Sequence, residues 1–274
     1  MSRIILRLHI MNFAIYQASQ IGGRKYNQDR VAYAYSNQSL LMVLADGMGG
    51  HMHGEIAAQL AIQVFTEAFV KVAQHPITEA KAFLSETMLR AHNAIIRYAD
   101  EQQLGGSPGT TCVAALIQDG KVCWAHAGDS RLYLLRGREA VTRTLDHSMV
   151  QQWADWGLIS AEEVKTHPDR NKITNCLGGV EDMFFVESSE VMPLQQGDTL
   201  LLCSDGLWGP LAGTEIAATL ANHPLPDALD QMMAEAISRE GTGSDNCTAI
   251  VARWGEAEEL RTTQLPIAVP FQYS

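Results

Sequence analysis

The sequence comprises 274 residues with a formal net charge of -11, and 46% of its residues are hydrophobic. A chain of this length and composition can bury a large core, which excludes wholesale disorder and suits one large domain or two small ones. The negative charge argues against nucleic acid as a partner, because binding to phosphate backbones needs clustered Lys and Arg.

Residues 1–11 are apolar and mildly basic but lack the full h-region and cleavage site of a signal peptide, so we expect either an N-terminal extension or a misplaced start. No apolar run approaches the ~20 residues that a membrane helix needs, so no membrane span is expected. The five cysteines are widely spaced, form no CxxC pair and mostly sit in apolar runs. They indicate buried thiols in a reducing compartment, and we expect a cytoplasmic protein.

In chain order, the pattern predicts three strands, then two long helices, then a β meander. The N-terminal strands are expected at 12–18, 31–35 and 39–45. Apolar residues recur at helical spacing from 55 to 73 and from 78 to 102. The meander strands are expected at 110–118, 121–128 and 130–136. Asp119-Gly120 provides the turn of its first hairpin.

Residues 146–180 differ in character and are expected to form an inserted flap, with helical patches at 148–156 and 160–165. Beyond the flap, the expected elements are strands at 183–191, 198–204 and 246–254 and helices at 213–221 and 226–239. Strands in consecutive hairpins with helices in separate blocks favour an antiparallel α+β architecture over βαβ winding. Residues 255–274 are expected to be a loosely attached C-terminal tail.

Aspartates recur where apolar strands start or stop, at Asp29, Asp46, Asp129, Asp205 and Asp245. A strand that ends in Asp projects the carboxylate from the rim of a sheet, and a following Gly lets the backbone carbonyl face a ligand. Several such rims around one cleft would gather the oxygen ligands that Mg²⁺ and Mn²⁺ prefer. One Asp-Gly pair alone indicates only a turn, as at Asp119-Gly120.

Six short motifs occur in a fixed order: Arg24…Asn27-Gln-Asp29, Asp46-Gly-Met-Gly-Gly-His51, Gly109-Thr-Thr111, Gly128-Asp-Ser-Arg131, Ser204-Asp-Gly206 and Ser244-Asp-Asn246…Thr248. This ordered set resembles the type 2C (PPM) metal-dependent protein phosphatases, and most of all their bacterial branch. The resemblance runs from about residue 14 to 254, and the flap segment shares it. Each motif alone is weak, whereas the ordered set is specific.

The resemblance implies a four-layer αββα sandwich, in which two antiparallel sheets are flanked by helices. The catalytic domain would span residues 12–254 with the flap at about 146–180. The implied activity is hydrolysis of phosphoserine and phosphothreonine in proteins by metal-activated water at a centre of two or three Mn²⁺ or Mg²⁺ ions. The enzyme would counteract a bacterial Ser/Thr kinase and would act as a monomer.

The resemblance also assigns metal ligands residue by residue. Asp46 would bridge two metal ions, and the carbonyl of Gly47 would bind one of them. Asp205 and Asp245 would hold the first ion, and Asp129 would reach a third, looser ion together with Asp205.

The expected catalytic residues are Arg24, Asp29 and Asp46. Arg24 would bind the substrate phosphate, as a guanidinium can with two parallel hydrogen bonds, and Asp29 would orient water from behind the metal ligands. Two positions depart from the eukaryotic pattern. Gln28 stands where many members have a carboxylate, and Met48 stands where they have the His suggested as general acid. The proton for the leaving group must then come from water or from another residue, or is not needed.

Other patterns fit less well. Neither Cys123 nor Cys203 is followed by Arg at the sixth position, as a cysteine phosphatase loop requires, and the sequence contains no Asp-x-Asp-x-Thr motif and no Walker loop. His51-Met-His53 matches the start of an HxHxDH hydrolase site, but Glu55 and Ile56 break the pattern. Two alternatives are an inactive module that binds phosphoproteins and a phosphatase dedicated to one partner protein. Retention of Arg24 and of the metal ligands argues against the first, and the lack of an additional sensing domain argues against the second.

Overall fold

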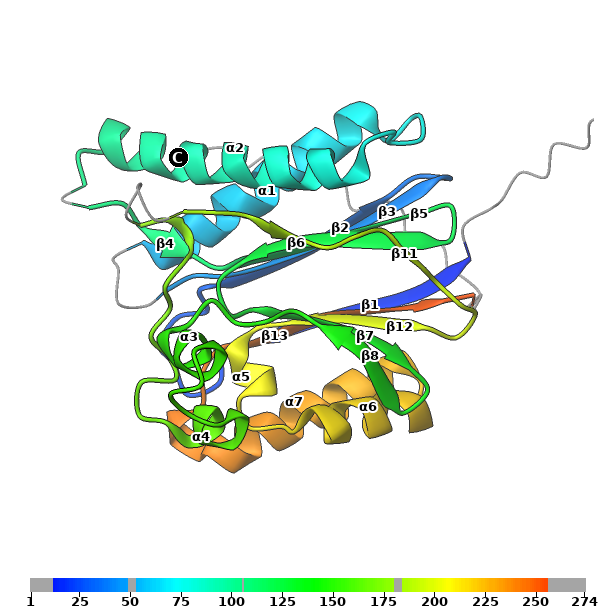
Figure 1. Cartoon of the computed structure of the whole chain (residues 1–274). Helices are drawn as coiled ribbons and strands as arrows, with labels where there is room; N and C mark the ends of the chain where they lie inside the picture. Colours follow the sequence, from blue (N-terminus) through cyan, green and yellow to red (C-terminus); the bar gives the residue numbers. More distant parts are fainter. Residues whose placement is uncertain (1–11, 49–52, 105, 180–183, 256–274) are drawn as a thin grey trace, which may run out of the picture.

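The computed structural model describes residues 12–48, 53–104, 106–179 and 184–255, in which two stacked β-sheets lie between helices (Figure 1). The expected N-terminal extension, nearly all of the expected tail and His51 lie outside these residues. The layers follow the order helices, sheet, sheet, helices, so the predicted four-layer αββα sandwich of antiparallel sheets is confirmed.

The first sheet has the strand order β10-β6-β5-β3-β2, with β11 also paired to β6. Its strands are β2 (Asp29–Tyr35), β3 (Ser39–Asp46), β5 (Cys112–Gln118), β6 (Lys121–Ala127), β10 (Glu187–Ser188) and β11 (Met192–Pro193). The second sheet has the order β1-β13-β12-β7-β8. Its strands are β1 (Phe13–Gln20), β7 (Arg131–Arg136), β8 (Glu139–Arg143), β12 (Thr199–Cys203) and β13 (Cys247–Trp254). Every pairing between these strands is antiparallel.

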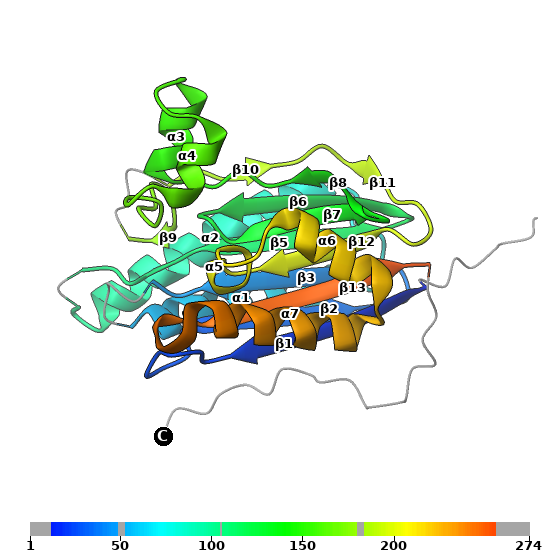
Figure 2. The same ribbon diagram turned by 90° about the horizontal axis from the view of Figure 1, so that it is seen from below.

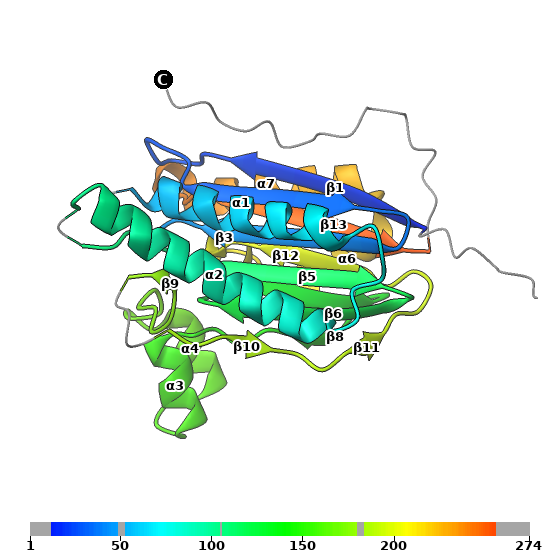
Figure 3. The same cartoon turned by 90° about the horizontal axis from the view of Figure 1, so that it is seen from above.

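Helices cover the outer face of each sheet. The long helices α1 (Gly54–Val72) and α2 (Ala80–Glu101) lie across the first sheet (Figure 3). The second sheet is covered by α5 (Asp205–Trp208), α6 (Gly213–Asn222) and α7 (Leu225–Glu240). The flap carries α3 (Met149–Asp155) and α4 (Ala161–Thr166), which project to one side of the sandwich (Figure 2). Strands β4 (Gly109–Thr110) and β9 (Leu177–Gly178) form a small two-stranded sheet. It pairs the end of the flap with the segment that leads into β5 of the first sheet.

Strand β3 shows why the apolar runs are uninterrupted. Alternate residues of a strand face opposite sides of a sheet. Leu40, Met42 and Leu44 pack between the two sheets, whereas Leu41, Val43 and Ala45 pack in the core under α1 and α2. Because both faces are buried, no polar residue stands between Ser39 at the start of the strand and Asp46 at its end.

The sequence-based prediction differs from the structure mainly in short or exposed elements. Of the strand expected at 183–191, the described residues contain only the two-residue strand β10, and the two-residue strand β11 follows it. Strand β8 was not predicted, because it is a largely exposed edge strand with an irregular register and therefore has no apolar alternation. Helix α5 was not predicted because it is a single turn. Among the described residues, no helix is both long and apolar enough to cross a membrane.

Candidate active site

One end of the sandwich carries a pocket of about 780 Å³. All but one of the predicted site residues line it, from segments far apart in the sequence: Arg24, Asp46, Gly47, Asp129, Asp205 and Asp245. Gln28 and Met48 line it as well, and flap residues such as Met149, Asn171 and Thr174 form its other side. The structure therefore brings the strand-end aspartates to one cleft between the sheets and the flap.

The hairpin of β2 and β3 places two of the aspartates opposite each other. Asp29 and Asp46 are directly paired across the two strands. Asp46 faces the pocket, whereas Asp29 is only 3% exposed and is not among the residues that line it. Asp29 therefore lies behind Asp46. It does not line the pocket, so it can act on a substrate only through another group.

The backbone of Asp46 is fixed by the Gly109-Thr-Thr motif. Its carbonyl accepts hydrogen bonds from the Thr111 N–H at 2.8 Å and the Thr110 hydroxyl at 2.9 Å, and its N–H donates to Thr111 Oγ1 at 3.1 Å. Gly47 follows at a point of close backbone packing, since an added Cβ would lie 2.4 Å from the Gly54 carbonyl oxygen. Only glycine fits there, and the chain turns sharply beside the pocket.

Asp205 is the first residue of α5 and is separated from the end of β12 by Ser204 alone. The preceding Ser204 is fully buried, and its hydroxyl donates to Asp29 Oδ2 at 2.8 Å. Gly206 packs against the segment before β13, because an added Cβ would lie 2.1 Å from the Asn246 carbonyl oxygen. The hydrogen bond between Ser204 and Asp29 joins the second sheet to the first behind the pocket.

Asn246 organises the loop that carries Arg24. Its side-chain Nδ2 donates to the carbonyls of Ile21 and Tyr26, both at 2.9 Å, and its Oδ1 accepts from the Gln28 N–H at 2.8 Å. Arg24 Nη2 lies 2.6 Å from Asp245 Oδ2, and both side chains are more than a third exposed. This ion pair is therefore screened by solvent and available to other partners.

The turn between β6 and β7 carries Asp129. Its carbonyl accepts a hydrogen bond from the Trp208 indole N–H at 3.0 Å, and its carboxylate Oδ1 is buried without a partner. The Ser130 hydroxyl lies 2.7 Å from Thr111 Oγ1, which links this turn to the contacts of Asp46. Trp208 thus holds a site residue by hydrogen bonding.

The carboxylates of the pocket raise each other's pKa. Burial, followed by the charges of Asp245 and Asp29, raises the pKa of Asp205 to about 7. Burial also raises the pKa of Asp46 and of Asp129 well above the usual range, with repulsion from neighbouring aspartates adding to the rise. Desolvation raises the pKa of Asp29 to about 6 despite the Ser204 hydroxyl. Such a cluster has an excess of unpaired oxygen ligands and favours a cation.

The protein phosphatase 2C family model matches residues 16–246, which is most of the chain. The chain belongs to the protein phosphatase 2C family. Its ordered motifs, its sandwich of sheets and its acidic pocket all agree with this assignment, and it is a phosphatase enzyme of the 2C type.

Individual relatives support the same assignment. The serine/threonine phosphatase stp of Listeria monocytogenes is 33% identical over 231 residues, which cover 83% of this chain and 90% of that protein. The crystal structure of the Mycobacterium tuberculosis serine/threonine phosphatase PstP/Ppp has 32% identity and a TM-score of 0.78, covering 89% of this chain and 99% of that one. The catalytic domain of PstP in complex with 2 manganese ions has 31% identity and a TM-score of 0.72, covering 88% and 97%.

Several residues of this 2C-type site had no individual role in the sequence analysis: Thr111, Ser204, Trp208 and Asn246. Thr111, Ser204 and Asn246 lie inside the recognised motifs, and Ser204 and Asn246 are each next to a predicted metal ligand in the sequence. Their function is to fix backbone positions by hydrogen bonds between distant segments, which no local pattern predicts. Met48 lines the pocket, and its thioether has no proton to give a leaving group.

Proposed function

We propose that this phosphatase hydrolyses phosphoserine and phosphothreonine in other proteins at a centre of two or three Mn²⁺ or Mg²⁺ ions. The observation that carries the proposal is the convergence of the aspartates on one pocket. Asp46, the Gly47 carbonyl, Asp205 and Asp245 would hold the two principal ions, and Asp129 with Asp205 would hold a third.

The donor set fits such ions. Every proposed ligand atom is an oxygen, as hard divalent cations prefer, and Asp129 Oδ1 is buried with no other partner. The raised pKa values of Asp46, Asp129 and Asp205 follow from burial and from like charges that a cation would neutralise. Divalent cations bound there would lower the pKa of water and offset charge on the phosphoryl oxygens.

Arg24 would bind the phosphate. Its guanidinium reaches the pocket from a loop fixed by Asn246, and it shares Asp245 as an ion-pair partner. A cation at Asp245 would compete with Arg24 for that carboxylate and so release the guanidinium toward the phosphate. Asp29 would act from behind Asp46 by orienting the attacking water.

Hydrolysis breaks the bond between phosphorus and the Ser or Thr oxygen, and a water oxygen takes its place. Cys176 lines the pocket, but burial raises the pKa of its thiol to about 11, so it is protonated and unsuited to nucleophilic attack. This argues for water as nucleophile. With Met48 at the position of the eukaryotic His, the departing oxygen would take its proton from water.

The finer properties are also proposals. The catalytic domain would span residues 12–254 with the flap at about 146–180, and the chain would work as a cytoplasmic monomer that opposes a Ser/Thr kinase. The five free cysteines, four of them buried, agree with a reducing compartment. Proteins rather than small phosphate esters are favoured as substrates because flap residues extend the pocket wall beyond the carboxylates.

The test is hydrolysis of a phosphothreonine peptide by the whole chain, with Mn²⁺ and then with EDTA. Activity should require Mn²⁺, vanish with EDTA and fall by at least ~1,000-fold in Asp46→Asn. Asp119→Asn is the matched control, since Asp119 is an exposed turn residue with φ 51°, a conformation that Asn tolerates. Full turnover in Asp46→Asn, or activity unaffected by EDTA, would overturn the metal assignment.

A further inference from the structure

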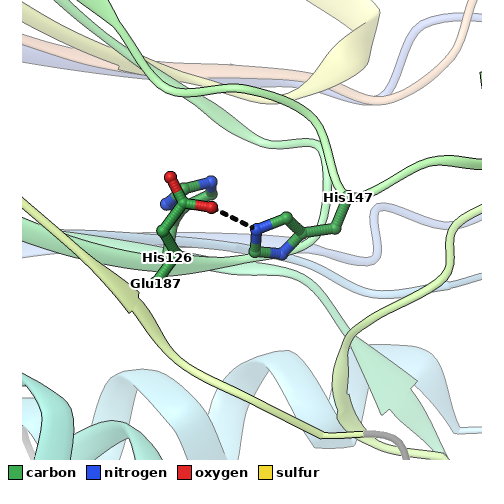
Figure 4. A group of neighbouring side chains, drawn as sticks. All are labelled: His126, His147 and Glu187. Carbon is green, nitrogen blue, oxygen red and sulfur yellow. Dashed lines mark hydrogen bonds and ion pairs between the residues drawn. The ribbon is translucent and has the colours of Figure 1, made fainter. Parts of the chain in front are cut away.

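A second group of titratable side chains lies beside the pocket, where His126, His147 and Glu187 place one ligand atom each within 4.8 Å of one another (Figure 4). His126 and His147 are buried and stacked, with ring centroids 4.5 Å apart. Glu187 points its carboxylate at the His147 ring. A transition metal is the first ligand to consider for two imidazoles and a carboxylate.

The hydrogen bonds of His147 exclude that metal. Its Nδ1 accepts from the Gly128 N–H at 3.2 Å and from Asn175 Nδ2 at 2.9 Å. The Asn175 amide cannot turn over, because its Nδ2 also donates to the Phe185 carbonyl and its Oδ1 accepts from the Phe185 N–H. The His147 Nδ1 therefore carries no proton, and Nε2 carries it and donates to Glu187 Oε2 at 3.1 Å. The nitrogen that faces Glu187 has no lone pair for a metal.

The same bonds reveal what His147 holds. Its backbone N–H donates to the Gly128 carbonyl at 3.0 Å while its ring accepts from the Gly128 N–H, so both polar groups of Gly128 bind one residue. Gly128 has φ +108°, and an added Cβ would lie 2.6 Å from Thr111 Cβ. The turn before Asp129 is thus held in a conformation open only to glycine, against Thr111 on one side and His147 on the other.

The residues beside His147 reinforce this contact. His126 donates its Nε2–H to the Leu145 carbonyl at 2.8 Å. Asp146 accepts two hydrogen bonds from the Arg131 guanidinium, both at 2.7 Å. The start of the flap is therefore fastened to β6 and β7 on either side of the turn that carries Asp129. Because the Asp129 Oδ1 has no partner, the backbone of this turn is what directs its carboxylate.

We propose that His147 is a positioning residue whose Nδ1 lone pair joins the flap to the Gly128 amide and thereby aims the Asp129 carboxylate into the pocket. The part that concerns metal binding rests on the proposed function, in which Asp129 is a ligand. The hydrogen bond from Nε2–H to the half-exposed Glu187 orients the imidazole ring. It contributes less to the position of Gly128 than the bond that Nδ1 accepts. The His147 Nδ1 accepts hydrogen bonds from both Gly128 and Asn175. It therefore also links Asn175, a flap residue that lines the pocket, to the turn that carries Asp129.

Two substitutions of His147 separate the roles of its two ring nitrogens, Nδ1 and Nε2. In His147→Asn, Oδ1 takes the place of Nδ1 and accepts from Gly128, but nothing reaches Glu187. In His147→Gln, the terminal amide reaches Glu187, but nothing replaces Nδ1. Glu187→Gln keeps an acceptor for the Nε2–H and serves as a control for the outer bond.

Hydrogen exchange of the Gly128 amide, followed by NMR in the whole chain, is the first readout. We expect His147→Asn and Glu187→Gln to resemble wild type and His147→Gln to exchange at least about tenfold faster. Calorimetric titration with Mn²⁺ is the second, where His147→Gln should weaken the lowest-affinity binding by about tenfold and His147→Asn should not. Equal behaviour of the Asn and Gln variants in exchange would overturn the proposal.

A measurement on wild type guards against variants that fail to fold. Long-range proton–nitrogen NMR should show His147 protonated on Nε2 and not on Nδ1. The opposite tautomer, or Zn²⁺ bound by wild type and lost in Glu187→Gln, would overturn the proposal in favour of a metal site. Absence of Mn²⁺-dependent hydrolysis in wild type would instead refute the proposed function, and the Gly128 exchange comparison would still decide the role of His147.

Discussion

Asp205→Asn should make the metal-free protein less sensitive to rising pH. The pKa of Asp205 is raised from 3.8 to about 7 by burial and by the charges of Asp245 and Asp29. Asn has nearly the same shape but cannot ionise. In wild type, the free energy of unfolding falls when this buried carboxyl loses its proton. The variant has no proton to lose there, so it lacks that destabilisation.

The sign and size follow from proton linkage. A carboxyl whose pKa is higher in the folded state contributes stability that is full below about pH 4 and is lost as pH rises through about 7. The rise from 3.8 to about 7 corresponds to about 4 kcal/mol, which solvent contact at the pocket reduces to about 2–4 kcal/mol. About half of this loss, ~1–2 kcal/mol, falls between about pH 5.5 and pH 8.

Urea unfolding in EDTA at about pH 5.5 and pH 8 measures this effect. The stability of Asp205→Asn relative to wild type should increase by ~1–2 kcal/mol between the two pH values. Comparing the difference at two pH values removes any fixed packing effect of the amide. Asp119→Asn, at an exposed turn, should show no such change. A difference that is constant, or that shrinks as pH rises, would refute the argument from buried like charges.

Three further substitutions test other contacts. Arg24→Ala should raise KM for a phosphothreonine peptide by about tenfold with a smaller effect on kcat, and Arg24→Lys should lie between; an unchanged KM would contradict phosphate binding. Gly206→Ala should destabilise by at least ~2 kcal/mol in thermal unfolding, because its Cβ would lie 2.1 Å from a backbone carbonyl, whereas Gly243→Ala has open space and should be tolerated. Arg131→Leu should cost about 3 kcal/mol, because the buried Asp146 then keeps only Arg143, at 3.9 Å, as an ion-pair partner, and the double variant Arg131→Leu/Asp146→Leu should recover part of that loss in urea unfolding; no recovery would mean that the pair is not the cause.

The architecture was predictable from sequence because its strands are buried on both faces. A run such as Leu40 to Ala45 has no polar member, and it stops at an aspartate where the sheet ends. Elements without such a pattern were missed. The edge strand β8 is mostly exposed, and the short strands β10 and β11 follow the first sheet's border with only two residues each.

The pocket was predictable to a similar degree, and for the same reason. Aspartates at strand ends must lie at a rim, so Asp46, Asp129, Asp205 and Asp245 could be expected to meet. What the sequence did not indicate is which groups hold them. Asn246 and Trp208 act across more than 70 residues of chain, through hydrogen bonds that depend on the packed fold.

The strongly buried sheets explain how one site can hold so many like charges. Asp46, Asp205 and Asp245 each adjoin a central strand whose residues are almost wholly buried, namely β3, β12 and β13. Their repulsion cannot be relieved by local movement, because a shift of one residue in register would move every core side chain of the strand to the opposite face, which is already packed. The repulsion therefore remains as raised pKa values and lost stability until a cation neutralises it. Binding of the ion should consequently stabilise the fold, and more strongly as pH rises and the carboxyls ionise.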